Sequence, residues 1–254
     1  MQVLKFGGSS VGSEKAIGSV VEIVTQSLQN KPCIVVVSAM HGVTDQLLML
    51  AQTAAQGNEA YKTIIENIEQ KHLDIVRTLL PIQQQSATLS IVKQLINEIE
   101  ANCEGLFMLK ELSPRMKDKI VCYGELLSSK IISATFSSKG INQQWVDARE
   151  LIKTDSNFLN AVVDKELTYK TIQDYFKNPV NAFDLYIAPG FISSDKEGNT
   201  TTLGRGGSDY TGAIFAAALN ADRLEIWTDV SGMMTADPRI VHNAKEIPQI
   251  SYQE

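Results

Sequence analysis

The stretch Val3-Leu-Lys-Phe-Gly-Gly-Ser-Ser10 starts as a short apolar strand, passes through two glycines and leads into a helix predicted from about Ser13 to Gln29. Glycines let a backbone approach a phosphate closely, and the N-terminus of the following helix adds amide donors and a partial positive charge. Lys5 adds a full positive charge at the carboxyl end of the strand. The spacing matches neither a Walker A loop nor a Rossmann fingerprint, so a tight turn is the alternative to a phosphate cradle.

A second loop, Leu203-Gly-Arg-Gly-Gly-Ser-Asp-Tyr-Thr-Gly212, repeats the order of strand, glycines and helix start. Ser208 is predicted to cap a helix that runs to Leu219, and Asp209 then lies in the first turn, where the helix dipole favours a carboxylate. That preference alone would account for an aspartate at position 209, even if the residue had no role in a binding or catalytic site. Arg205, in the same loop, can hold a ligand carboxylate in a bidentate fork.

A third loop follows a strand predicted from Leu224 to Thr228 and continues as a long turn shaped by Gly232 and Pro238. Thr228 and Asp229 stand where this strand ends. In open parallel sheets, ligands bind outside the carboxyl ends of the strands. All three loops belong to that edge, so we predict one shared site.

Short apolar runs alternate with amphipathic stretches along the chain, which is the pattern of βαβ units around a buried, mostly parallel sheet. The fold class is therefore α/β. The other predicted elements are strands at 33–37, 144–147 and 185–189, a hairpin at 192–203 that turns at 195–199, a helix capped by Thr44 or Asp45, a helical hairpin at about 58–110 broken near Pro81, and a helix at 120–138.

Composition narrows the class of protein. The chain has 254 residues, 44% apolar and 20% charged, which suits one large globular domain. The net charge of −6 does not favour binding to nucleic acid, which usually requires an overall basic surface. The three cysteines and three histidines lack metal-ligand or redox spacing, which predicts no protein metal site. Without a signal peptide or an apolar run of roughly 20 residues, we expect a cytoplasmic protein that does not enter a membrane.

Taken together, these segments closely resemble the signature segments of aspartokinases, in order and over nearly the whole chain. The region from about 58 to 110 contributes little. The resemblance implies a three-layer α/β/α sandwich of the amino-acid kinase type, around a mostly parallel eight-stranded sheet. The segments that carry it are Lys5–Val11, Val37–Ser38, Gly42–Thr44, Tyr123–Glu125, Gly204–Asp209 and Trp227–Arg239.

The resemblance implies an aspartate kinase. Such an enzyme transfers the γ-phosphoryl group of ATP, with Mg²⁺, to the β-carboxylate of L-aspartate and gives 4-phospho-L-aspartate, the first step of lysine, threonine and methionine biosynthesis. By analogy, Lys5 neutralises phosphate oxygens and Asp209 organises the site. Gly7, Gly8 and Ser9 would cradle phosphate. Substrate contacts would come from Ser38, Thr44, Glu125, Arg205 and Ser208, and nucleotide contacts from Thr228, Asp229, Met234 and Arg239. Many relatives have Tyr where Met234 stands.

The residue types agree with this chemistry. Glu125 can bind an α-ammonium group and Arg205 an α-carboxylate. A carboxylate acceptor is already ionised, so the reaction needs no general base and must instead overcome repulsion between acceptor and triphosphate. Lys5, Mg²⁺, loop amides and helix N-termini can do this together. Asp209, an anion beside phosphates, requires Mg²⁺ or a lysine ammonium close by.

The end of the sequence, Ser251-Tyr-Gln-Glu254, has the pattern of a capping box, which announces a helix. This predicts a catalytic domain cut from a longer chain, and the ending resembles the bifunctional aspartokinase–homoserine dehydrogenases. In the aspartokinase family a phosphate-binding lysine and the regulatory ACT domains lie beyond this point. We therefore expect residues 1–254 to be weakly active or inactive, and the full-length protein to be a homo-oligomer.

Two alternatives remain at this stage. Another amino-acid kinase, for acetylglutamate, glutamate, carbamate or UMP, would share the fold and the phosphate loops. The set Ser38, Thr44, Glu125 and Arg205 favours an amino acid with free α-groups, and so aspartate. The other alternative is that the fragment is a non-catalytic ligand-binding domain.

Overall fold

A five-stranded parallel sheet forms the centre of the molecule in the computed structural model, which describes residues 1–177, 183–230, 232–238 and 240–251. The strand order is β3-β4-β2-β1-β7, and each neighbouring pair is parallel. Among the described residues the sheet has five strands, not the eight that the resemblance implied. The strands of this sheet are β1 (Gln2–Phe6), β2 (Cys33–Val37), β3 (Gln143–Trp145), β4 (Leu185–Pro189) and β7 (Arg223–Trp227), and a separate antiparallel hairpin is formed by β5 (Ile192–Ser194) and β6 (Thr200–Thr202).

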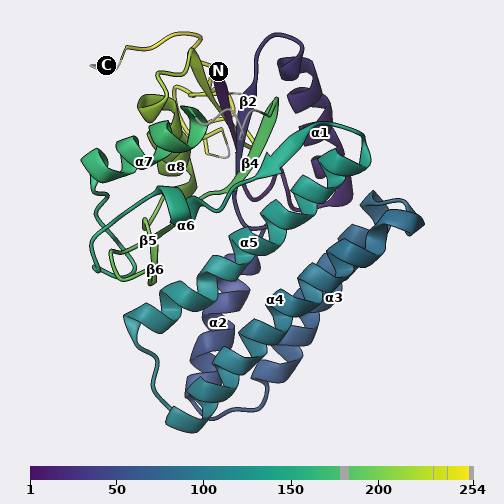
Figure 1. The fold of residues 1–254 in the computed structure, drawn as a ribbon, viewed down its shortest axis with the longest axis vertical. Coiled ribbons are helices and arrows are strands. Elements are labelled where there is room, and N and C mark those ends of the chain that lie inside the picture. Colours follow the sequence, from purple (N-terminus) through teal and green to yellow (C-terminus); the bar gives the residue numbers. More distant parts are fainter. Residues whose placement is uncertain (178–182, 231, 239, 252–254) are drawn as a thin grey trace.

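Helices cover both faces of the sheet, which makes the predicted α/β/α sandwich (Figure 1). Helices α1 and α5 lie on one side and α7 and α8 on the other, while α2, α3 and α4 form an outer group beside α5 (Figure 1). The helices are α1 (Glu14–Leu28), α2 (Val43–Ala55), α3 (Tyr61–Leu79), α4 (Ile82–Leu109), α5 (Pro114–Ser138), α6 (Ala148–Leu151), α7 (Lys165–Lys177) and α8 (Gly207–Ala218). None of the helices in the described part of the chain is both long and apolar enough to cross a membrane.

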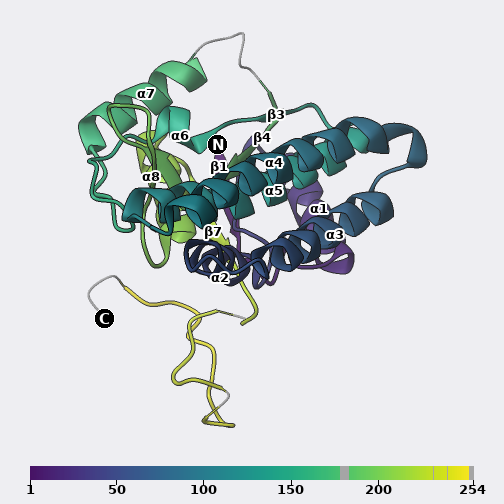
Figure 2. The ribbon, with the colours of Figure 1, turned by 90° about the horizontal axis from the view of Figure 1, so that it is seen from below.

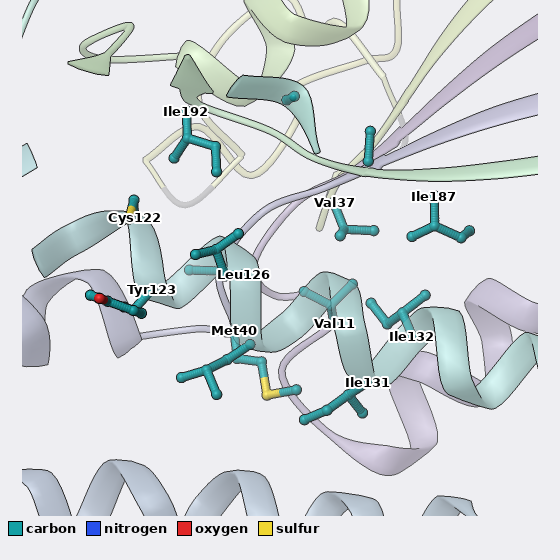
Figure 3. Close-up of a cluster of buried hydrophobic side chains, with 14 of the residues drawn as sticks. Val11, Val37, Met40, Cys122, Tyr123, Leu126, Ile131, Ile132, Ile187 and Ile192 are labelled. Atoms are coloured by element: carbon teal, nitrogen blue, oxygen red, sulfur yellow. The ribbon is translucent and has the colours of Figure 1, made fainter. Parts of the chain in front are cut away.

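The core lies between the sheet and α5. All five residues of β2 are buried, as expected for a central strand with helices on both faces. Val37 of β2 and Ile187 of β4 point toward Ile132 of α5, and Leu126 continues the same apolar face of that helix (Figure 3). This packing fixes α5 over the carboxyl ends of the strands.

The strands end level with one another. Phe6 of β1 is opposite Val37 of β2 and Trp227 of β7, and Val37 is in turn opposite Pro189 of β4. Each of these residues is the last of its strand. The loops that follow four separate strands therefore start at the same edge of the sheet.

The region 58–110 is a pair of long helices packed side by side, α3 and α4, as the sequence predicts (Figures 1 and 2). Leu80, between them, is extended with φ −103° and ψ 141°, the conformation that a following proline favours. Pro81 then leads directly into α4. The pair buries apolar residues such as Ile68 and Ile99 in the same core as the sheet.

Several predicted helix starts are wrong. Glycines with left-handed φ occupy the N-cap positions of α2 and α8, Gly42 at 77° and Gly206 at 74°, so neither Thr44, Asp45 nor Ser208 caps a helix. Helix α5 begins at Pro114 instead of 120, because the Ser113 hydroxyl caps it by accepting the amide of Met116 at 3.3 Å. Helices α6 and α7 were not predicted.

The chain after β7 runs away from the helical body toward the C-terminus (Figure 2). Met234 forms an isolated antiparallel bridge with Glu246 in this segment. Most of the predicted capping box lies outside the described residues, because these end at Ser251.

Candidate functional site

The loops after β1 and β2 are held together by main-chain hydrogen bonds. The amide of His41 donates to the Gly8 carbonyl at 3.1 Å, and the amide of Ser38 donates to the Phe6 carbonyl at 3.1 Å. A Cβ atom on Gly8 would lie 3.0 Å from the Ala39 carbonyl oxygen, so a side chain there would push the two loops apart. The glycine allows the close approach that holds this wall of the site.

Helix α5 fixes the loop after β2 from the other side. The amide of Ala39 donates to Glu125 Oε1 at 3.1 Å, and the Ser128 hydroxyl donates to the Ser38 carbonyl at 2.7 Å. A Cβ atom on Gly124 would come within 2.8 Å of Ala39 Cβ. The helix backbone therefore lies directly against the loop, with Glu125 beside it.

The N-terminus of α8 is locked against the loop after β4. A Cβ atom on Gly190 would lie 2.7 Å from Ser208 Cβ, and one on Gly207 would lie 2.7 Å from the Phe191 ring. The amide of Phe191, at a left-handed φ of 67°, donates to the Thr211 hydroxyl at 2.9 Å. These contacts aim the first turn of α8, and with it Asp209, at the edge of the sheet.

A cavity of about 350 Å³ opens between these loops. The loops that follow β1, β2 and β4 reach it from the shared edge of the sheet, and the glycine loop after β6 of the separate hairpin and Glu125 of α5 complete the lining. Seven of the predicted site residues line it, namely Lys5, Gly8, Ser38, Thr44, Glu125, Ser208 and Asp209. The sequence therefore identified most of the polar lining of one pocket from segments that lie far apart in the chain.

Lys5 and Asp209 form an ion pair inside this cavity, with 2.6 Å between Lys5 Nζ and Asp209 Oδ1. The Lys5 side chain is 10% exposed and that of Asp209 is 46% exposed. The ammonium expected near Asp209 is therefore a lysine of the chain itself. An ion pair this open to solvent contributes little to stability, but it orients a cation toward the cavity.

Glu125 is the most buried charged side chain of the cavity, at 3% exposure. Its Oε2 atom has no hydrogen-bond partner among the described residues. Burial raises the pKa of Glu125 to about 8, although the bond from the Ala39 amide acts in the opposite direction. A buried carboxylate oxygen of this kind is best satisfied by a cationic donor, such as a ligand ammonium group.

Two predicted residues take other positions. Arg205 is exposed and is absent from the described lining of the cavity, although Gly204 and Gly206 on either side belong to it. Both glycines have left-handed φ, 72° and 74°, so the arginine stands on a sharply turned loop. The amide of Gly7 donates to the Trp227 carbonyl at 3.1 Å, which engages it in holding β7.

Part of the predicted nucleotide set lines a second cavity, of about 320 Å³. It holds Ser9, Thr228 and Asp229 beside Phe6 and Trp227. Lys5 and Phe6 are successive residues of β1 and point to opposite faces of the sheet, so the glycine loop borders both cavities. Met234 lines neither of these two cavities, and Arg239 lies outside the described residues.

The sequence reasoning missed several residues of the first cavity, among them His41, Asp45 and Phe191. His41 and Phe191 stand in loops that follow strands, and Asp45 lies in the first turn of α2 directly after such a loop, so position after a strand was the available signal. Lys71 of α3 donates to the His41 carbonyl at 2.7 Å and so connects the helical hairpin to the site. No pattern in the sequence indicated that contact.

Comparison with known proteins identifies the family. The profile of the amino acid kinase family matches residues 1–254. This chain belongs to the amino acid kinase family. Its sheet, its glycine loops and the cavity between them are thus the framework of an amino acid kinase.

Individual members of the family are similar over the whole chain. The lysine-sensitive aspartokinase 3 of Escherichia coli is 35% identical over 258 residues, which cover 99% of this chain and 54% of that protein. The bifunctional aspartokinase/homoserine dehydrogenase of Buchnera aphidicola is 33% identical over 260 residues, or 100% of this chain and 31% of its own length. This amino acid kinase chain therefore spans about half or less of these two relatives.

Solved structures show the same likeness. The crystal structure of E. coli aspartokinase III in complex with aspartate and ADP, in its R-state, superposes with a TM-score of 0.88 at 33% identity, covering 97% of this chain and 53% of that one. Aspartate kinase from Clostridium acetobutylicum gives a TM-score of 0.78 at 29% identity, covering 100% of this chain and 53% of that one. The sandwich of Figure 1 is therefore that of an amino acid kinase.

Proposed function

We propose that the chain is the catalytic part of an aspartate kinase, which transfers the γ-phosphoryl group of ATP to the β-carboxylate of L-aspartate and gives 4-phospho-L-aspartate. The observation that carries this proposal is the first cavity, which contains both the Lys5 ammonium and a buried acidic side chain, Glu125, whose Oε2 atom has no hydrogen-bond partner among the described residues. A substrate that has both a carboxylate and an ammonium group complements these two charges. The similarity of this chain to aspartokinases, in sequence and in structure, supports the same substrate.

The charges suggest how aspartate is oriented. Its α-ammonium group binds Glu125, which places its β-carboxylate toward Lys5 and the N-terminus of α8. Arg205 binds the α-carboxylate after the glycine-flanked loop turns it toward the cavity. An N-acetylated amino acid lacks the ammonium group, so it offers no cation that would compensate for the ionisation of the buried Glu125. The site therefore selects aspartate over acetylglutamate.

The transfer itself depends on position and charge. Lys5 neutralises oxygens of the transferring group, while amides of the Gly8–Ser9 turn and the α8 N-terminus add dipoles aimed at the same place. Asp209 holds the Lys5 ammonium in the direction of the phosphate. Thr228, Asp229, Met234 and Arg239 contact the nucleotide from the β7 side, where Thr228 and Asp229 already line a cavity. The acceptor carboxylate is ionised, so no side chain has to remove a proton.

Mg²⁺ fits the residues present. No group of three or more His, Cys, Asp or Glu side chains in the described part of the chain could hold a metal. Nucleotide-bound Mg²⁺ does not require one, because it keeps waters and phosphate oxygens and takes only one or two carboxylates. Asp209, half-exposed beside Lys5, is the carboxylate that would hold it. The ion would supply charge neutralisation on the phosphates.

The proposed reaction also implies a pathway and a cellular compartment. The reaction belongs to the start of lysine and threonine biosynthesis, and we place it in the cytoplasm. The three free, buried cysteines support a reducing compartment. The full-length protein is expected to be a homo-oligomer.

Turnover with competing acceptors tests the proposal. A full-length version of the protein, which contains residues 1–254, is incubated with MgATP and hydroxylamine, and acyl hydroxamate is measured with aspartate, glutamate or N-acetylglutamate as acceptor. Aspartate should give the highest kcat/KM, and Glu125→Gln should remove most of its advantage over N-acetylglutamate. A preference for N-acetylglutamate, or the absence of any aspartate-dependent product, would overturn the assignment.

A further inference from the structure

We propose that Asp118 is a positioning residue that anchors the glycine loop 204–207 and thereby the first turn of α8. This residue lies outside the substrate cavity and touches no group assigned above to catalysis. It lies on α5, seven residues before Glu125, so the two carboxylates share one face of the helix two turns apart. One carboxylate holds the loop after β2, and the other holds the strand that leads into the glycine loop.

The carboxylate of Asp118 is fully buried and has three donors. The Thr202 hydroxyl donates to its Oδ1 at 2.6 Å, and the amides of Thr202 and Leu159 donate to its Oδ2 at 3.1 and 2.9 Å. Two of the donors are main-chain groups from separate segments. A buried carboxylate with this set of bonds joins the two segments at one point.

The two joined segments converge on Gly204. The amide of Ala161 donates to the Thr202 carbonyl at 2.9 Å, which extends the connection that Asp118 starts. A Cβ atom on Gly204 would lie 2.5 Å from Asn160 Oδ1 and 3.4 Å from the Leu159 carbonyl oxygen. Gly204 therefore packs against the Leu159–Asn160 segment, which Asp118 connects to the end of β6.

From Gly204 the chain enters the site directly. The amide of Gly207 donates to the Gly204 carbonyl at 3.0 Å, and α8 begins at Gly207. Gly204, Gly207 and Asp209 all line the first cavity. A change at Asp118 should consequently alter the orientation of Asp209, although the two side chains belong to different parts of the structure.

The test compares variants of Asp118 with a matched control. Asp118→Ala removes all three acceptor contacts. Asp118→Asn keeps the volume, and its amide can still accept from the two main-chain donors while donating to the Thr202 hydroxyl. Asp195→Ala is the control, because Asp195 is also buried, accepts the Asn199 amide at 2.8 Å and fixes the far end of the same β5–β6 hairpin.

The first readout is limited trypsin digestion after Arg205, which is exposed and lies inside the anchored loop. We expect Asp118→Ala to raise the rate of this cleavage at least about tenfold, because two main-chain donors lose their partner. Asp118→Asn should stay within about threefold of wild type, and Asp195→Ala should leave this cleavage unchanged. Mass spectrometry of the fragment that ends at Arg205 measures the rate.

The second readout is kinetic and rests on the proposed function. Asp118→Ala should lower kcat for aspartate phosphorylation about 10- to 100-fold and change the aspartate KM much less, while Asp118→Asn restores most of the rate. A purely structural residue would show neither this split nor the rescue. The kinetic measurement uses the full-length protein. If its wild-type form has no turnover with aspartate, the proposed function fails, and the digestion alone decides the anchoring role.

Two outcomes would overturn the inference. One is an unchanged rate of cleavage after Arg205 in folded Asp118→Ala, and the other is equal acceleration by Asp195→Ala. If Asp118→Ala does not fold, Thr202→Val takes its place, because valine has the same shape and lacks only the hydroxyl donor. That variant should accelerate the cleavage by a smaller factor, and an unchanged rate would again overturn the inference.

Discussion

Lys5 Nζ lies 2.6 Å from Asp209 Oδ1, and this ion pair connects the end of the first strand to the first turn of the last described helix. The strand fixes the backbone of Lys5, and the contacts of Gly190 and Gly207 fix the helix. The ammonium is therefore oriented before any ligand binds. Preorganised charge of this kind is usually the largest single contribution to catalysis.

Removing either member of the pair should abolish most turnover and leave the fold intact. We expect Lys5→Met and Asp209→Ala each to lower kcat by about 10²- to 10³-fold, because each loses oriented charge at the transferring group. Stability should fall by about 1 kcal/mol or less, since half of the Asp209 side chain is exposed. The hydroxamate assay and thermal denaturation measure the two effects.

The control for this pair is Lys15→Met, which removes an exposed lysine near the start of α1. It should leave both kcat and stability close to wild type. Near-normal rates in Lys5→Met or Asp209→Ala would exclude that residue from the mechanism.

Glu125 should make stability depend on pH. Its pKa in the folded chain is about 8, above the ordinary 4.5, because burial disfavours the charge. The native chain therefore retains a proton that the unfolded chain has lost. The stabilisation that this proton represents is complete below about pH 4.5 and is lost as the pH rises toward 8. Glu125→Gln lacks the titration, so its Tm should rise relative to wild type between pH 5 and pH 8.

Thermal denaturation of both proteins at several pH values gives the difference directly. Titration calorimetry adds an independent check, because binding of the aspartate ammonium should ionise Glu125. At pH 7 close to one proton should be released in wild type and none in Glu125→Gln. A difference in Tm that does not vary with pH would show that Glu125 is ionised in the free protein.

Gly124 should be essential for the packing of α5 on the loop after β2. An alanine there would put its Cβ 2.8 Å from Ala39 Cβ. We expect Gly124→Ala to lower the free energy of unfolding by about 1–3 kcal/mol and to raise the aspartate KM, because Glu125 moves with the helix. Urea denaturation and the hydroxamate assay measure these changes.

Gly18→Ala is the matched control. Gly18 also lies inside a helix, α1, and a Cβ atom there would have no neighbour within 4 Å. Alanine should therefore raise stability, by up to about 1 kcal/mol, through helix propensity alone. If the two substitutions changed stability alike, the contact between Gly124 and Ala39 would not matter.

Arg205 should act on substrate binding more than on the transfer. It stands exposed between two glycines with left-handed φ, and we expect it to reach the cavity after a local change of the loop. Arg205→Ala should raise the aspartate KM about tenfold or more and lower kcat much less, and Arg205→Lys should recover only part of the affinity, because lysine cannot form a bidentate pair. An unchanged KM would remove Arg205 from the substrate site.

The sequence predicted the parts of the fold that depend on local pattern. Strand β2 was recognisable because all five of its residues are apolar, and the hairpin turn because Gly198 follows three charged residues. Helix α7 was missed because its sequence is mostly polar, and only Thr168 and Ile172 are buried among its described residues. The starts of α2 and α8 were misplaced because a glycine N-cap leaves no side-chain signal.

For the site, the two glycine loops that follow strands were enough to select Lys5 and Asp209, and the family resemblance added Ser38. What could not be predicted is how the walls are held. Lys71 reaches His41 from a helix thirty positions away, and Asp118 reaches Thr202 across 84 positions. Such contacts depend on the tertiary packing of α3 and α5, which no local pattern in a single sequence specifies.

Because the strands of the sheet end opposite one another, the protein should tolerate insertions and deletions in some segments and not in others. Deleting one residue inside β1 would turn the Lys5 side chain to the opposite face of the sheet, toward α1, and separate it from Asp209. The hairpin of α3 and α4 has no such constraint, because the two helices can lengthen or shorten together at their far ends without moving any strand end. Insertions should therefore accumulate in the helical hairpin of this family, while the strands keep their residue count.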